Sequence, residues 1–233
     1  MKISQTTKNQ HWLWVKIQQK EVEFSKLPRQ GIQRIKRFSE CEKLSTMSIP
    51  LAKQIALVVI DMQPFFLTNI QAAARVANRC RFAISVSKLF GIKVLFTEQV
   101  PEKLGHTLPE LIDADTDAIV FSKTSFSAFG AKDFKETLRR SEIRHLLVTG
   151  IETPICVYNT ALQAQAHGME VTLLEDCIGA RRTEDANSVL NFLRQNSDCH
   201  ILPSETIFYS LLQDAENSLF REYTNLVKGT DII

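Results

Sequence analysis

Short, almost continuous apolar runs recur along the chain from residue 55 onward. They cover residues 55–60, 92–96, 118–121, 145–148, 169–174 and 200–202. Runs of this length that are rich in Val, Ile and Leu and free of Pro are typical of parallel strands covered on both faces. Successive runs begin roughly 25 to 37 residues apart, which is the spacing that strand–helix–strand units require.

The segments between these runs have helical periodicity. One of them repeats apolar residues at intervals near 3.6, namely Ala72, Val76, Ala77, Cys80, Ala83, Ile84 and Leu89. Gly91 and Gly168 each stand between a predicted helix and the next strand, where a C-cap residue needs positive φ. Further helices are expected over residues 157–167, around Leu190 and over residues 219–227. The pattern predicts a three-layer α/β domain with a six-stranded, mostly parallel sheet.

Composition narrows the class of protein. The chain has 233 residues, of which 44% are hydrophobic and 23% are charged, and this balance favours a folded domain. Its apolar runs are far shorter than the roughly 20 residues of a membrane span, so we expect no membrane partner. The formal net charge of +2 gives little reason to expect nucleic acid as a partner.

The first 47 residues differ from the rest. They contain ten Lys and Arg against four Asp and Glu, and they hold both tryptophans. We expect residues 1–47 to form a basic N-terminal extension outside the core domain of residues 48–233. An appended tail, a targeting segment and an arm for nucleic acid or a membrane surface all remain open for it.

The five cysteines are widely spaced, and no CxxC pair occurs. The sequence therefore contains neither a zinc-ribbon motif nor a thioredoxin motif. A reducing, cytoplasmic location is expected, with most of these thiols acting as small buried apolar groups.

Three residues that carry chemistry follow the predicted strands. In such sheets the site lies beyond the carboxyl ends of the strands, where strand order reverses. Asp61 follows the first strand, Lys123 the third, and Cys156 the fourth at the predicted start of a helix. An acid, a cation and a thiol whose pKa a helix N-terminus lowers would supply a base, an anion stabiliser and a nucleophile. Each residue alone is also compatible with a structural role, as a turn aspartate, a surface lysine and a core cysteine.

These segments resemble the isochorismatase-like cysteine hydrolases. The resemblance rests on "ALVVIDMQ" with Asp61, "FSKTSFSAF" with Lys123 and "LLVTGIETPICVYNTALQAQAHGMEVTLLEDCIGAR" with Cys156, and it extends over residues 54–228. Within the superfamily, "TEQVPEKLGHTLPEL" and "SETIFYSLLQDA" resemble the isochorismatase domain-containing subgroup, which is akin to a group of octameric bacterial hydrolases.

The resemblance implies hydrolysis of a small amide or related acyl substrate by an Asp–Lys–Cys triad through a thioester, and a homo-oligomeric assembly. It also implies a cis peptide between Ile151 and Glu152, with an oxyanion hole formed by the backbone N–H groups of Glu152 and Cys156. True isochorismatases cleave a vinyl ether and lack the cysteine, so Cys156 argues against that reaction.

No metal or other cofactor is expected. Related nicotinamidases bind a metal through an Asp-x-His motif near the end of the second strand, and this chain has Thr97, Glu98 and Gln99 there. Residues flanking the triad are candidate pocket walls, namely Gln63, Phe65, Phe126, Pro154 and Ile155. Two other functions remain open: a non-catalytic scaffold, and a redox-sensing thiol protein in which Cys177 resolves Cys156.

Overall fold

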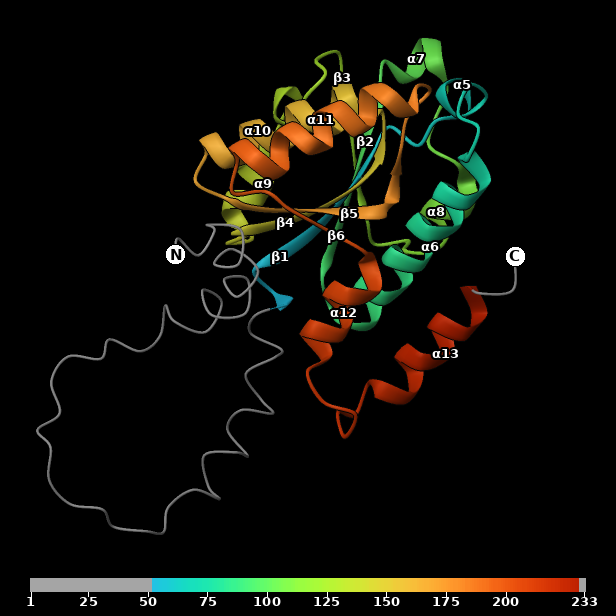
Figure 1. Cartoon of the computed structure of the whole chain (residues 1–233), viewed down its shortest axis with the longest axis vertical. Coiled ribbons are helices and arrows are strands. Elements are labelled where there is room, and N and C mark those ends of the chain that lie inside the picture. The colour runs from blue at the N-terminus through green and yellow to red at the C-terminus, as the bar shows by residue number, and fades with distance from the viewer. Residues whose placement is uncertain (1–51, 231–233) are drawn as a thin grey trace, which may run out of the picture. The chain divides into compact units, whose positions relative to one another are not determined.

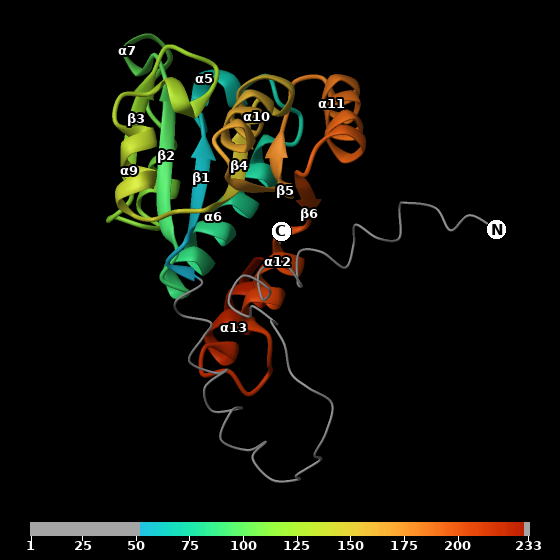
Figure 2. The same ribbon diagram turned by 90° about the vertical axis from the view of Figure 1, so that its left-hand side faces the viewer.

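The structure is a computed structural model, and it describes residues 52–230, so the predicted extension over residues 1–47 lies outside the described residues. The described strands are β1 (Ile55–Ile60), β2 (Lys93–Gln99), β3 (Ile119–Lys123), β4 (His145–Ile151), β5 (Glu170–Gly179) and β6 (His200–Leu202). They form one sheet in the order β3-β2-β1-β4-β5-β6, with every neighbouring pair parallel (Figure 2). The predicted six-stranded parallel sheet is confirmed.

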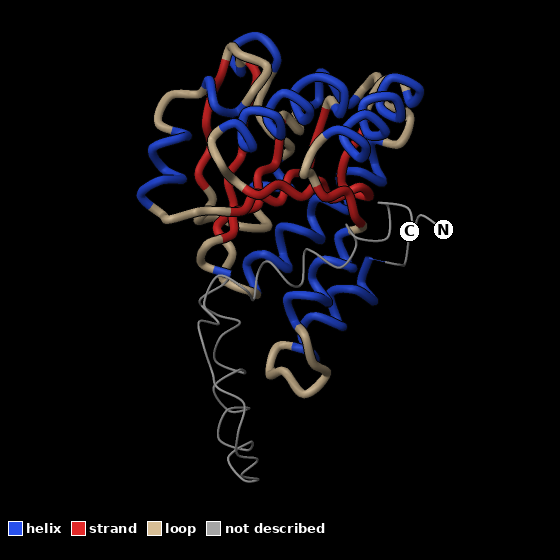
Figure 3. Tube along the Cα trace, turned by 60° about the vertical axis from the view of Figure 1, so that its left-hand side comes forward, coloured by secondary structure: helices blue, strands red, loops and turns tan. Residues whose placement is uncertain are grey.

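Helices cover both faces of this sheet. Over residues 52–230 they are α5 (Pro64–Leu67), α6 (Ala73–Leu89), α7 (Pro101–Leu104), α8 (Pro109–Ile112), α9 (Phe134–Arg140), α10 (Tyr158–Ala166), α11 (Thr183–Asn196), α12 (Ser204–Leu212) and α13 (Phe220–Thr230), with the short turns η1 (Ala128–Gly130) and η2 (Thr153–Val157). Helices α9, α10 and α11 lie on one face, and α6 and α8 on the other, where α13 packs against α6 (Figure 1). Figure 3 shows the strands between these two helical layers. None of the helices in the described range combines the length and apolar character that crossing a membrane requires.

The apolar pattern explains the layers. All six residues of β1 are buried, since this central strand has a helical layer on each side. Its alternate residues Ala56, Val58 and Ile60 belong to the core shared with α10 and α11. Gly91 and Gly168 have φ of +69° and +74°, so the positive φ predicted at both helix ends is confirmed.

Four strands extend beyond their predicted ends, and β5 continues from residue 174 to Gly179. The apolar runs predicted that β2 ends at residue 96 and β4 at residue 148, whereas the strands continue to Gln99 and Ile151. Strand β3 likewise continues to Lys123. The pattern fails there because the added residues include polar side chains that are nevertheless buried, among them Thr97, Glu98, Gln99 and Lys123.

Strands β1 and β4 approach closely where strand order reverses. Ile60 and Gly150 are paired in the ladder, and Gly150 has φ of +102°. A Cβ atom at Gly150 would lie 2.1 Å from the carbonyl oxygen of Ile60, far inside van der Waals contact. Only glycine therefore fits at this position. Because it has no side chain, the last residues of β1 and β4 can lie close together. The segments that follow carry Asp61 and Cys156.

We predict that Gly150→Ala destabilises the domain by more than about 4 kcal/mol, because the new atom meets backbone that cannot move aside. Gly91→Ala is the matched control. It also has positive φ, but nothing lies within 4 Å of the point where its Cβ atom would stand, so it should cost only about 1–2 kcal/mol. Urea unfolding monitored by circular dichroism measures both, and equal losses for the two variants would contradict the prediction.

Candidate active site

The structure brings Asp61, Lys123 and Cys156 together at the carboxyl ends of the strands. Asp61 directly follows β1, Lys123 is the last residue of β3, and Cys156 lies in η2 after β4. The Lys123 Nζ atom lies 2.7 Å from Asp61 Oδ2 and 3.9 Å from Cys156 Sγ. The side chains of Asp61 and Lys123 are 1% and 0% exposed, so this ion pair is shielded from water.

Hydrogen bonds fix the carboxylate of Asp61. The Thr97 hydroxyl donates to its Oδ1 atom at 2.8 Å, and the Asp61 backbone N–H donates to the Thr97 carbonyl at 3.0 Å. The Cys156 side chain is also within hydrogen-bonding reach of the Asp61 carboxylate.

Two further oxygen atoms surround the ammonium of Lys123. Gln99 Oε1 accepts from Nζ at 2.6 Å, and the carbonyl oxygen of Ser125 accepts at 3.2 Å. The sequence pattern predicts neither of these contacts, nor that of Thr97. Thr97 and Gln99 lie at the end of the second strand, where the sequence analysis finds only the absence of a metal-binding motif. The signal that could have identified them is a run of polar residues that directly continues a buried strand toward the site.

Burial dominates the ionisation of the site. Removal from water raises the pKa of Asp61 above its ordinary value, and the Lys123 charge opposes this rise. Burial, followed by the negative charge of Asp61, raises the pKa of Cys156 to about 12. The predicted low pKa of this thiol is therefore wrong: desolvation and a nearby carboxylate outweigh the Lys123 charge. Cys156 is protonated at neutral pH, and forming its thiolate requires a base.

The segment that carries Cys156 begins with an unusual backbone conformation. The peptide bond between Ile151 and Glu152 is cis, at the position that the resemblance implied. The next turn, η2, is π-helical, and α10 begins only at Tyr158, so Cys156 lies one turn before the regular helix. Single π-helical turns are frequent at functional sites. The backbone N–H of Glu152 faces the Cys156 sulfur and favours its anionic form.

A cavity of about 370 Å³ lies beside this segment. Its walls come from η2 and the residue before it, from the segment that follows β5 and from α11. They are Glu152, Pro154, Ile155, Arg181, Arg182, Asp185, Ser188 and Val189. Charged side chains of both signs line it, and Arg181 Nε donates to Glu152 Oε1 at 2.8 Å. The lining includes Pro154 and Ile155, the two residues before Cys156 in the chain, whereas Asp61, Lys123 and Cys156 themselves are outside it.

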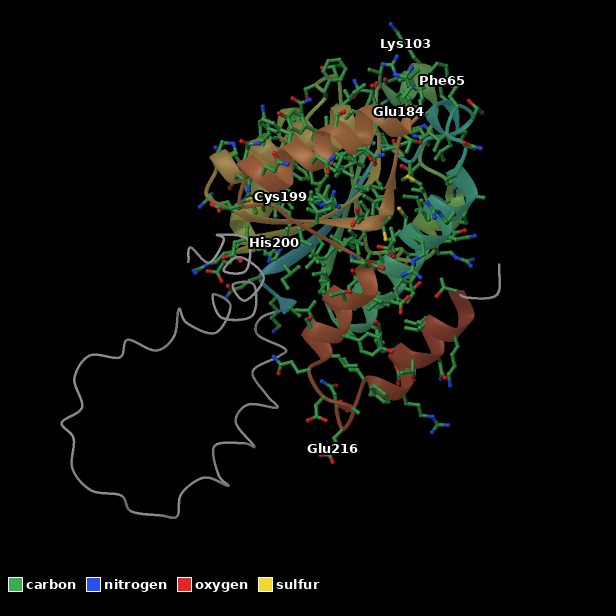
Figure 4. All side chains as sticks on the ribbon, in the orientation of Figure 1. Phe65, Lys103, Glu184, Cys199, His200 and Glu216 are labelled. Carbon is green, nitrogen blue, oxygen red and sulfur yellow. The ribbon has the colours of Figure 1, made fainter. Side chains whose placement is uncertain are left out.

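The predicted pocket walls divide into two groups. Pro154 and Ile155 line the cavity, whereas Phe65 and Phe126 are outside its lining and are 56% and 61% exposed. Figure 4 shows Phe65 close to Lys103, at the end of the domain that carries α5 and α7. The expectation for Gln63 is wrong. Its side chain is buried, with its amide hydrogen-bonded to the backbone of Gln99, because it ties two strand ends together.

The other chemistry-bearing side chains do not join this site. Within residues 52–230 no group of three or more His, Cys, Asp or Glu side chains could hold a metal ion. His106 Nδ1 instead lies 3.0 Å from Glu98 Oε2. Cys177 Sγ contacts the carbonyl oxygen of Arg79 in α6, so this sulfur faces the helical layer opposite the one that holds Cys156.

Comparisons with known proteins agree with this architecture. A family model described as the isochorismatase domain matches residues 55–201. Isochorismatase domain-containing protein 2A of Mus musculus is 32% identical over 178 residues, which are 76% of this chain and 84% of the mouse protein. The structure named MAR1 ribonuclease from Caenorhabditis elegans has a TM-score of 0.71 and 25% identity, covering 76% of this chain and 91% of that chain.

A bacterial structure shares the fold at lower identity. The YcaC gene product of Escherichia coli, described as an octameric hydrolase of unknown specificity, has a TM-score of 0.67 and 19% identity. The match covers 77% of this chain and 95% of the bacterial chain.

We predict that Lys123→Met slows alkylation of Cys156 by iodoacetamide at pH 7 by on the order of tenfold or more. The Lys123 charge lowers the pKa of both Asp61 and Cys156, so its loss keeps the base protonated and the thiol neutral. Mass spectrometry of the peptide that contains each cysteine measures the rate.

Cys199 is the internal control for this measurement. It is 7% exposed, as is Cys156, and burial raises its pKa to about 12 as well. Cys199 lies at the amino end of β6, whereas the candidate site lies at the carboxyl ends of the strands. Figure 4 accordingly shows Cys199 far from Phe65, which follows the carboxyl end of β1. Its rate should be the same in wild type and variant. An unchanged Cys156 rate in Lys123→Met would contradict the assignment of the lysine.

Proposed function

Because the chain belongs to the isochorismatase family, we propose that it is a cysteine-dependent hydrolase that cleaves a small amide or a related acyl substrate. The observation that carries the proposal is the buried contact of Lys123 with both Asp61 and Cys156. Asp61, Lys123 and Cys156 supply a proton acceptor, a fixed positive charge and a nucleophilic sulfur within one water-excluded volume.

In the first half of the reaction, Asp61 takes the proton of the Cys156 thiol as the sulfur attacks the substrate carbonyl carbon. The carbonyl oxygen becomes an oxyanion, which the backbone N–H groups of Glu152 and Cys156 stabilise. In a serine protease, one such donor contributes about 10²–10³ in rate. Asp61 then gives the proton to the departing amine nitrogen, the carbon–nitrogen bond breaks, and a thioester remains on Cys156.

In the second half, Asp61 removes a proton from water, and the resulting hydroxide attacks the thioester carbonyl. The carbon–sulfur bond breaks, the carboxylic acid leaves, and the thiolate of Cys156 takes back a proton. Lys123 keeps its charge throughout, lowering the cost of negative charge on Asp61 and on the sulfur. The raised pKa of Asp61 suits this role, because a base near the working pH both accepts and returns a proton readily.

The substrate class follows from the cavity and the nucleophile. A volume of about 370 Å³ suits a small molecule, and its mixed Arg, Asp and Glu lining suits one with polar groups. The name of the nematode neighbour refers to ribonuclease activity in that protein. A sulfur nucleophile that forms a thioester acts on carbonyl carbon, so we place amides before RNA here.

We also propose that the chain assembles with copies of itself, since the Escherichia coli neighbour is described as an octamer. Strand β3 forms one edge of the sheet, and its Ile119 and Val120 side chains are 39% and 42% exposed. Exposed apolar side chains on a sheet edge suit contact with another chain.

The alternative functions have less support. A redox pair requires a resolving thiol near Cys156, and Cys177 contacts α6 instead. A scaffold without catalysis would have no need for a buried ion pair beside a cysteine, which costs desolvation energy.

The function is tested by screening small aliphatic and aromatic amides, and a short RNA, against wild type and Cys156→Ala. We expect at least one amide to be hydrolysed by wild type, with loss of the nucleophile lowering kcat by roughly 10⁶-fold, to the detection limit. Asp61→Asn should lose turnover as well, since no other base among the described residues is positioned at the sulfur.

Unfolding curves of both variants serve as the control that the fold survives. The proposal would be contradicted by undiminished amide hydrolysis in Cys156→Ala. Cleavage of RNA that depends on Cys156, with no amide turned over, would also overturn it.

A further inference from the structure

We propose that Gln99 is a positioning residue for this site. Its side-chain carbonyl holds the Lys123 ammonium at the point from which the positive charge acts on both Asp61 and Cys156. The inference rests on the proposed function of Asp61, Lys123 and Cys156, and it adds a fourth side chain, which does not touch the reacting atoms.

The geometry around the ammonium gives Gln99 this role. An ammonium has three N–H donors, and the three short contacts of Nζ are to Asp61 Oδ2 at 2.7 Å, Gln99 Oε1 at 2.6 Å and the Ser125 carbonyl at 3.2 Å. Because these donors are occupied, Lys123 acts on Cys156 Sγ, at 3.9 Å, through its positive charge and not through a strong hydrogen bond. Gln99 is thus the side chain that keeps the ammonium from pairing with Asp61 alone.

The amide of Gln99 has only one workable orientation. Its Nε2 atom donates to the carbonyl oxygen of Thr124 at 2.8 Å, while Oε1 accepts from Lys123. A flipped amide would place N–H donors against the ammonium and oxygen against a carbonyl oxygen, which are two repulsive contacts. The contacts on both sides therefore aim the Gln99 carbonyl at Lys123.

The backbone of Gln99 is held as firmly as its side chain. Gln63 Oε1 accepts from the Gln99 N–H at 2.7 Å, and Gln63 Nε2 donates to the Gln99 carbonyl at 3.1 Å. In the ladder, Gln99 is the register partner of Lys123 on the neighbouring strand. Val100 comes next at φ 41° and ψ 61°, a left-handed conformation that a β-branched residue rarely adopts.

The consequence for the chemistry is electrostatic. The charged and titratable groups that act on Asp61 within residues 52–230 are Lys123 from β3 and Cys156 from η2, and the Thr97 hydroxyl from β2 adds a hydrogen bond. The Lys123 charge lowers the pKa of Asp61 and of Cys156 against the effect of burial. If the ammonium is no longer held at this point, the pKa of both groups rises.

The test is the pH dependence of Cys156 alkylation by iodoacetamide in the full-length chain carrying Gln99→Met. We expect the acid limb of the rate curve to move to higher pH by about one unit, which makes the variant about tenfold slower on that limb. Gln99→Asn is a second variant that keeps an amide in the interior but is too short for its carbonyl to reach Nζ. Its acid limb should move in the same direction.

Gln195→Met is the matched control, since Gln195 is exposed on α11, and its curve should coincide with that of wild type. A merely structural Gln99 would lower the melting temperature or slow alkylation equally at every pH without moving the acid limb. That result, or wild-type rates throughout, would overturn the inference. If Lys123→Met slows alkylation and the Gln99 variants do not, Gln99 alone is wrongly assigned. If Lys123→Met has no effect, the proposed function fails first.

Discussion

The buried ion pair of Asp61 and Lys123 is the interaction on which the site depends. Removing both charges from water is costly, and such a pair is tolerated only when further hydrogen bonds satisfy the remaining donors and acceptors. Here Thr97, Gln99 and the Ser125 carbonyl provide those bonds. The pair thereby places a carboxylate and a fixed cation beside Cys156, in a volume where their charges act strongly.

The sheet topology supplies the geometry for this pair. Parallel strands end at one edge, and the reversal of order between β1 and β4 opens the edge above them. Gly150 allows β1 and β4 to approach closely, so the residues that follow them share one small volume. Strand β2 then links the two sides, because Thr97 hydrogen-bonds Asp61 and Gln99 hydrogen-bonds Lys123.

The fold was largely predictable from the sequence, because apolar runs in strands and periodic apolar residues in helices report burial directly. The apolar runs end before Gln99 and Lys123, the true ends of β2 and β3, because the last buried positions of these strands hold polar side chains that hydrogen-bond one another. The sequence pointed to Asp61, Lys123 and Cys156 because each follows one of the apolar runs that predict the strands. The ionisation of Cys156 was not predictable: a helix N-terminus suggested a low pKa, whereas burial and Asp61 raise it to about 12.

The roles of the partner residues were hidden for a related reason. Gln63 lies two residues after Asp61, a position that suggests a pocket wall, yet its amide hydrogen-bonds the Gln99 backbone. Which oxygen atoms surround an ammonium depends on the lateral register of β2 and β3, which no local pattern encodes. Sequence thus located the site, and the strand register defined its supporting contacts.

The central claim is that Asp61 and Lys123 make Cys156 a nucleophile that becomes acylated during turnover. Acid quenching during hydrolysis of an amide substrate, followed by mass spectrometry of the Cys156 peptide, tests it most directly. We expect a mass increase equal to the acyl group, located on Cys156 and lost when the quenched protein is treated with hydroxylamine. Steady turnover with an unmodified Cys156 peptide at every quench time, in a protein whose Cys156→Ser variant is equally active, would contradict it.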